Sequence, residues 1–175
     1  NKYMTNIEFT NTLKLKPVED LAMDVIRFVL SNRYQDIIRE DEGGAYGVNV
    51  AASYTAYPKH TQAIAINFQS NTEQGDRMRA IIHEQIDKLV AEGVSEEDVE
   101  DMVLMMKKGR TNMLANRGNV HWQEALRYYA ETGKDIDSPV MFEQPIEKLN
   151  AKIVHEVAKK FFTTAECVDI VVRSK

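Results

Sequence analysis

The feature that most constrains the fold is a change in the spacing of apolar residues near residue 45. Before it they recur every three to four positions, which indicates helix, and after it they alternate, which indicates strand. The alternating residues of the first strand are Tyr46, Val48, Val50, Ala52 and Tyr54. A turn over 56–60 and a second alternating run over 64–68 complete the pattern of an antiparallel hairpin. The chain must therefore combine a sheet with helices.

Helical patterns lie on both sides of this hairpin. After Pro17 the spacing predicts a helix that is interrupted at Ser31 and Asn32 and resumes as a second, short helix before Gly43. Downstream, capping signals divide residues 71–162 into successive helices. The first is expected over 71–92, opened by an Asn71–Gln74 capping box and ended by Gly93, and the second begins at Ser95. A third is expected over 119–131, ended by Gly133. Two more are expected, one within 138–149 and one over 150–162 that is capped by Asn150.

Two short alternating runs at the ends of the chain predict further strands. Residues 3–10 place Ile7 and Phe9 on one face, and residues 167–172 close the chain with a run rich in valine. The last strand must pair with strands formed far upstream. The expected fold class is α+β, a small and mostly antiparallel sheet covered by a layer of helices, and the 175 residues suit a single domain over 1–175.

Composition excludes several function classes. Apolar residues make up 43% and charged residues 28%, as in an ordinary globular protein, and the net charge of -5 disfavours nucleic acid and anionic membranes as partners. We expect no membrane span, because no apolar run approaches the required length of about 20 residues. The single cysteine fits a periplasmic or secreted setting as well as the cytoplasm. Since the chain begins with Asn1, we expect it to be a piece of a longer, multi-domain protein.

Metal binding by this chain alone is not expected. "HEQID" (83–87) imitates an HExxH site but has Asp87 in place of the second histidine, and "HWQEA" (121–125) imitates the inverted HxxEH motif but ends in Ala125, which cannot ligate. No third ligand is evident. Nucleophilic catalysis is disfavoured too, because Cys167 lies within an apolar strand pattern and there is no GxSxG elbow.

The stretch "REDEGGAYG" (39–47) has two interpretations. In the first it is a helix end, a glycine cap and a strand start, with Arg39 in a surface salt bridge and Tyr46 packed in the sheet. In the second, Arg39 and Tyr46 point into one cavity. There the arginine donates hydrogen bonds in a fixed fork, and the tyrosine hydroxyl donates to a carbonyl oxygen that is becoming an oxyanion. Composition alone favours the first interpretation.

A family resemblance favours the second. Residues 30–50, "LSNRYQDIIREDEGGAYGVNV", resemble the signature of the insulinase/pitrilysin family of zinc metallopeptidases, in which an Arg and a Tyr stand seven positions apart, as Arg39 and Tyr46 do. The preceding helix pattern and the closing "VAKKFF…VDIVV" are similar to that family's carboxy-terminal type of domain. The resemblance implies that Arg39 binds substrate. It implies that Tyr46 holds the scissile carbonyl and stabilises the tetrahedral intermediate.

The same resemblance assigns the metal to another domain. In the family an inverted HxxEH motif binds zinc and supplies the glutamate base, and this chain has no such motif. Alone it should be inactive. The implied partners are a peptide or unfolded protein substrate and a zinc-bearing domain, in the same chain or in a partner subunit. The alternatives are a non-catalytic family member, acting as a structural subunit or peptide-binding module, and an unrelated α+β interaction domain.

Overall fold

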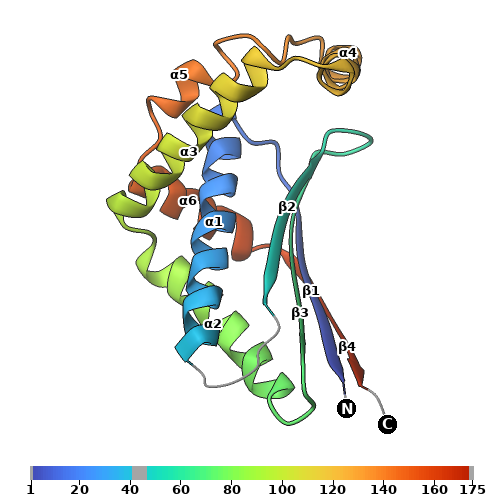
Figure 1. Cartoon of the computed structure of the whole chain (residues 1–175), viewed down its shortest axis with the longest axis vertical. Helices are drawn as coiled ribbons and strands as arrows, with labels where there is room; N and C mark the ends of the chain where they lie inside the picture. The colour runs from blue at the N-terminus through green and yellow to red at the C-terminus, as the bar shows by residue number, and fades with distance from the viewer. Residues whose placement is uncertain (1, 41–46, 174–175) are drawn as a thin grey trace.

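The chain folds into a four-stranded sheet with helices on one of its faces (Figure 1). The structure is a computed structural model that describes residues 2–40 and 47–173, with the side chains of 38–40 left out. In chain order the elements are β1 (Tyr3–Thr12), α1 (Pro17–Glu40), β2 (Asn49–Thr55), β3 (Thr61–Ser70), α2 (Gly75–Glu92), α3 (Glu96–Ala115), α4 (Asn119–Thr132), α5 (Glu143–Ile146), α6 (Ala151–Phe162) and β4 (Glu166–Arg173).

The strand order across the sheet is β2-β3-β1-β4, and every neighbouring pair is antiparallel. β2 and β3 form the expected hairpin. β4 returns from the end of the chain to pair with β1, so that Tyr3 lies opposite Arg173. The predicted α+β class and the long-range pairing of the last strand are both confirmed.

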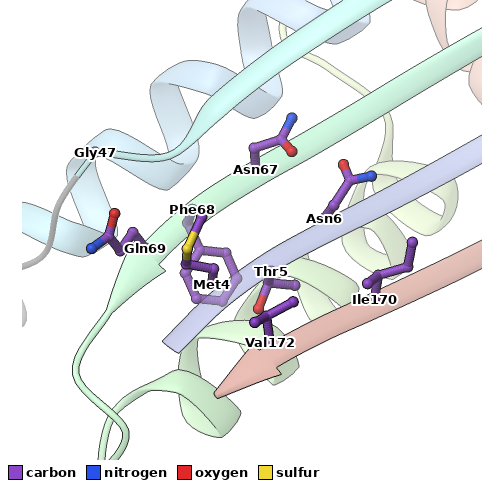
Figure 2. Close-up of a pocket in the computed structure, with 9 residues that line it drawn as sticks. All are labelled: Met4, Thr5, Asn6, Gly47, Asn67, Phe68, Gln69, Ile170 and Val172. Atoms are coloured by element: carbon purple, nitrogen blue, oxygen red, sulfur yellow. The ribbon is translucent and has the colours of Figure 1, made fainter. Parts of the chain in front are cut away.

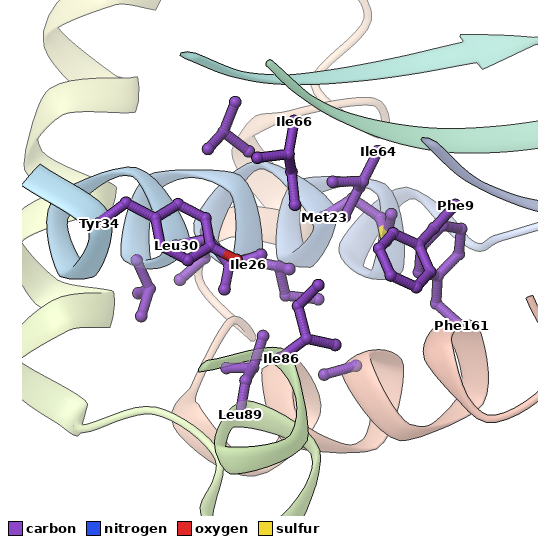
Figure 3. Packing of buried hydrophobic residues seen from close by; sticks show 14 of the residues in the cluster. Phe9, Met23, Ile26, Leu30, Tyr34, Ile64, Ile66, Ile86, Leu89 and Phe161 are labelled. Atoms are coloured by element: carbon purple, nitrogen blue, oxygen red, sulfur yellow. The ribbon is translucent and has the colours of Figure 1, made fainter. Parts of the chain in front are cut away.

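The core fills the space between one face of the sheet and helices α1, α2 and α6. Figure 3 shows Ile64 and Ile66 of β3 and Phe9 of β1 directed at α1, while residues of α2 and Phe161 of α6 close the cluster from the other side. Ile64, Ile66 and Phe161 are fully buried. Each such side chain contributes about 1.5–3 kcal/mol relative to an exposed position, so this face supplies most of the stability of the fold.

Several helix boundaries form by the predicted side-chain chemistry. The Ser95 hydroxyl accepts a hydrogen bond from the Asp98 N–H at 3.0 Å, and the Asp98 carboxylate accepts from the Ser95 N–H in return. Asn150 caps α6 by accepting from the Ile153 N–H. Gly93 and Gly133 end α2 and α4 with φ of 83° and 68°, a region that non-glycine residues rarely adopt.

The predicted interruption at Ser31 and Asn32 is wrong, because α1 continues through both residues to Glu40. Leu30 and Tyr34 are one turn apart and both are buried, so the apolar stripe of the helix is unbroken. The Tyr34 hydroxyl also donates to the backbone carbonyl of Ile82 in α2 at 3.2 Å. Asn32 is exposed, and a polar residue on the outer face does not break a helix.

The helix expected within 138–149 forms, but it is much shorter than the apolar pattern suggested. Only one turn, α5, forms there, and the rest is a series of turns held by Arg110 of α3. The Arg110 guanidinium donates to the carboxylates of Asp137 and Glu143 and to the backbone carbonyl of Asp137 at 3.0 Å. Tertiary contacts therefore override the local apolar pattern in this segment.

Two start positions are shifted as well. α2 begins at Gly75, after Gln74, although the Asn71 side chain does accept from the Gln74 N–H at 2.9 Å. β2 begins at Asn49, so Val48 precedes the strand, while the expected strand residue Tyr46 lies outside the described residues.

Candidate functional site

The face of the sheet that carries no helices has a shallow groove with a volume of about 380 Å³. Figure 2 shows the side chains that line it, which come from β1, β3 and β4, together with the backbone at Gly47. They are Met4, Thr5, Asn6, Gly47, Asn67, Phe68, Gln69, Ile170 and Val172. We call this depression the open-face groove.

A row of side-chain amides crosses the sheet beside the groove. Asn49 of β2 lies opposite Asn67 of β3, and Asn67 lies opposite Asn6 of β1. Figure 2 shows Asn6 and Asn67 standing side by side on this face. Within residues 2–40 and 47–173, neither side chain forms a hydrogen bond. Carboxamides both donate and accept, so this row can pair with the N–H and C=O groups of an extended peptide.

The other side of the groove is apolar. Val168, Ile170 and Val172 alternate along β4 and are 57%, 51% and 58% exposed, and Met4 lies opposite Val172 and is 50% exposed. Such a column of exposed aliphatic side chains is unusual on the surface of an isolated domain and marks a surface that contacts something else.

The groove offers binding rather than acid–base chemistry. None of its described lining residues has a side chain that ionises near neutral pH, and none is a good metal ligand. Whatever approaches the groove can be oriented there by amides and apolar contacts. A reacting group must come from elsewhere.

Arg39 and Tyr46, the two residues to which the sequence assigns a substrate role, are not tested by the structure. Arg39 belongs to the last turn of α1, but its side chain is outside the described residues, and so is Tyr46. Gly47, which follows Tyr46 in the chain, lines the open-face groove.

The histidines that imitate metal motifs are engaged in structural contacts. His83 is 3.3 Å from the Asp169 carboxylate, which also accepts from Arg79 at 2.5 Å, and His121 is 3.0 Å from the Asp137 carboxylate. His155 bonds the backbone carbonyl of Val90. Over residues 2–40 and 47–173, no group of three or more His, Cys, Asp or Glu side chains could hold a metal ion. Zinc does not fit the donor set of this part of the chain.

Cys167 occupies the predicted strand but is exposed on it. Partial desolvation and the nearby Asp169 carboxylate raise the pKa of its thiol, which keeps it protonated and weakly nucleophilic.

The amide row was missed by motif reasoning. Its signal is faint, because Asn6, Asn49 and Asn67 come from three strands and become neighbours only through the register of the sheet. The alternation of each strand predicts that these residues face away from the core. It cannot predict that they align.

Comparison with known proteins places this architecture in a family. The sequence profile described as the peptidase M16 inactive domain matches residues 8–106. A comparison with curated proteins found no match. No helix in the described part of the chain is long and apolar enough to cross a membrane.

Solved structures share the fold at low sequence identity. The periplasmic protease PqqL from Escherichia coli superposes with a TM-score of 0.82 at 16% identity, over 99% of this chain and 19% of its own. The ferredoxin protease FusC, solved in complex with Arabidopsis ferredoxin, gives 0.78 at 12% identity, over 97% of this chain and 18% of its own. A peptidase M16 inactive domain from Pseudomonas fluorescens superposes with a TM-score of 0.70 at 14% identity, over 97% of this chain and 40% of its own. The chain thus spans about a fifth of the length of the two proteases.

Proposed function

The chain belongs to the family of peptidase M16 inactive domains, and on that premise we propose that it is the substrate-side domain of a zinc metallopeptidase. The zinc and the general base belong to a second domain, in the same polypeptide or in a partner subunit. When bound there, the zinc polarises the scissile carbonyl and activates the attacking water. This chain contributes the surface that holds the substrate.

The single observation that carries the proposal is the open-face groove beside Gly47. On one side it has amides that lack a hydrogen-bond partner among the described residues, and on the other an exposed aliphatic column. An extended peptide can therefore satisfy its backbone polar groups and bury its side chains there. The substrates that fit are peptides or unfolded protein segments, since both expose their backbone.

Within this proposal, Arg39 and Tyr46 act at the scissile bond. The Arg39 guanidinium binds the substrate backbone by donating hydrogen bonds to carbonyl oxygens. The Tyr46 hydroxyl holds the scissile carbonyl and donates to its oxygen as negative charge develops in the tetrahedral intermediate. The support is their spacing in the sequence and the position of Gly47 on the groove.

The experiment that tests the proposal compares peptide hydrolysis by this chain, by the full-length parent protein, and by the parent after chelation of its zinc. We expect activity only from the zinc-loaded parent. Hydrolysis by the isolated chain would contradict the proposal, because the chain would then supply its own base.

A second candidate, a non-catalytic family member, is favoured by the absence of HxxEH from the sequence. Such a protein would use the same groove as a peptide-binding module or structural subunit. The parent reading frame distinguishes the two, because only the first candidate requires an HxxEH motif elsewhere in that frame or in a partner subunit. A parent that binds zinc and cleaves peptides excludes the second.

A further inference from the structure

A second cavity, of about 480 Å³, lies where the turn between β2 and β3 meets the start of α1 and the end of α4. We call it the hairpin-end pocket. Among its lining residues are Asp20, Tyr54, Tyr57, His60, Tyr128 and Glu131. Tyr54 lies opposite Gln62, seven residues along β3 from Gln69 of the open-face groove. Gln62 and Gln69 are therefore about 23 Å apart at about 3.3 Å per residue, and a ligand of one site need not touch the other.

Aromatic rings form part of the wall of the hairpin-end pocket. The Tyr54 and His60 rings are stacked, with centroids 6.0 Å apart and planes 9° from parallel, and the Tyr54 hydroxyl is 2.6 Å from His60 Nδ1. This contact fixes both rings. Tyr128 of α4 is half-buried, and Tyr57 at the tip of the turn is 80% exposed.

The half-buried carboxylate of Asp20 also lines this pocket. Among the described residues, its side chain accepts one hydrogen bond, from the neutral amide of Gln62, whose Nε2 is 3.2 Å from Asp20 Oδ1. Asp20 forms no ion pair with any residue of 2–40 or 47–173. Burial raises the pKa of this carboxyl to about 6, against the weaker lowering effect of Gln62. An ionised carboxylate held away from water without a cation is costly, which makes it a candidate for a ligand.

The charged groups around Asp20 leave its carboxylate without a counter-ion. Glu19 and Asp24 of α1 raise its pKa further, and Lys134, just after α4, lowers it from a distance beyond ion-pair range. The remaining titratable groups that line the pocket with it are Lys14, Tyr54, Tyr57, His60, Tyr128 and Glu131. Lys14, Glu131 and Lys134 are exposed, so solvent screens their charges more than that of Asp20.

We propose that the hairpin-end pocket binds an alkylammonium or guanidinium group, with Asp20 as its counter-ion and the rings of Tyr54 and Tyr128 against its alkyl chain. Charged hydrogen bonds to a carboxylate are stronger than neutral ones, and a cation is also attracted to the face of a phenol ring. The group is carried by a lysine or arginine side chain in a peptide, or by a small free amine. This site is independent of the role proposed for Arg39 and Tyr46.

The test is a titration of the isotope-labelled chain, followed by NMR at pH 7.5, with three probes. They are a short Gly/Ser peptide with one central lysine, the same peptide with norleucine in that place, and butylammonium. We expect saturable shifts around Asp20, Tyr54 and Tyr128 with the lysine peptide and none with norleucine. If butylammonium binds as tightly as the lysine peptide, a small amine is a sufficient ligand. If butylammonium binds much more weakly, the ligand is a lysine or arginine side chain within a peptide.

Asp20→Asn is the decisive variant, and Asp24→Asn is its matched control on the same helix. We expect Asp20→Asn to weaken binding of the lysine peptide about tenfold or more, equivalent to about 1.4 kcal/mol. Asp24 does not line the pocket and acts only through its charge, so Asp24→Asn should weaken binding far less. Equal binding of the lysine and norleucine peptides, wild-type affinity in Asp20→Asn, or no binding of any probe would overturn the proposal.

A stability measurement guards against a folding artefact. Because the Asp20 pKa is raised in the folded state, from 3.8 to about 6, its contribution to stability is fully present below pH 3.8 and is lost as the pH rises through 6. At pH 7.5, Asp20→Asn should therefore unfold at a higher temperature than the wild type. The variant should also lack the fall in stability that ionisation of Asp20 causes in the wild type as the pH rises through 6. A destabilised Asp20→Asn would mean that the carboxylate already has a structural partner, which would also contradict the proposal.

Discussion

The two faces of the sheet are built from the same four strands but have opposite surroundings. On one face Ile7, Ile64 and Ile66 are fully buried beneath α1, α2 and α6. On the other, the alternate residues of the same strands include asparagines with no hydrogen-bond partner among the described residues, and Ile170 is 51% exposed. Strand alternation produces both faces, yet only one of them is needed to fold the chain.

This difference separates the residues that stabilise the domain from those available for binding. The covered face is filled by packed apolar side chains. The open face has amides and an aliphatic column that stabilise nothing described in this chain, so they are free to contact a substrate or another domain. Matched substitutions on the two faces can test that separation.

The largest contrast is expected between Ile66→Ala and Ile170→Ala. Ile66 is fully buried, so truncating it leaves a cavity and should lower the free energy of unfolding by about 2–5 kcal/mol. Ile170 is exposed, and the same truncation should cost less than about 1 kcal/mol. Chemical denaturation measures both. Similar losses at the two positions would mean that the open face is also part of the core.

The next largest loss of stability is expected for Gly75→Ala, which tests how tightly the covered face packs near its edge. A Cβ at Gly75 would lie 2.2 Å from the Tyr3 ring, so Gly75→Ala must displace a fully buried side chain. We expect a loss of about 1–3 kcal/mol. Gly109→Ala in α3 is the control, because a Cβ there meets no atom within 4 Å, and it should stabilise the helix by up to about 1 kcal/mol. A neutral Gly75→Ala would show that Tyr3 can move at no cost.

The smallest effect on stability is expected on the open face, at Asn67→Ala. The side chain is exposed and forms no hydrogen bond within the described residues, so the unfolding free energy should change by no more than about 0.5 kcal/mol. Affinity for an extended peptide should fall, as measured by NMR titration of the groove. Unchanged affinity would remove the amide row from the proposed substrate surface.

The helix ends that depend on nearby residues are among the parts of the fold that the sequence predicts correctly. Ser95 with Asp98, Asn150, Gly93 and Gly133 act within one or two turns of the chain, and each marks a helix end where expected. The break predicted at Ser31 and Asn32 was wrong because two adjacent polar residues are typical of a helix end. The buried residues on either side, Leu30 and Tyr34, keep the helix continuous.

The candidate site was less predictable, for a physical reason. Arg39 and Tyr46 are close in sequence and follow a family pattern, so they could be named, although the structure does not describe their side chains. The amide row and the surroundings of Asp20 arise from strand register and from α1 meeting α4 and the β2–β3 turn. Such long-range neighbours leave no local periodicity in the sequence.

The most direct test of the central claim is the kcat for peptide hydrolysis of the zinc-loaded parent carrying Tyr46→Phe. The change removes one hydroxyl and keeps the ring, and Tyr129→Phe, at a tyrosine that is 61% exposed on α4, is the matched control. If Tyr46 stabilises the tetrahedral intermediate, its loss should lower kcat about ten- to a thousand-fold, as for one oxyanion donor, while Tyr129→Phe leaves kcat unchanged. An unchanged kcat in Tyr46→Phe would contradict the assigned role.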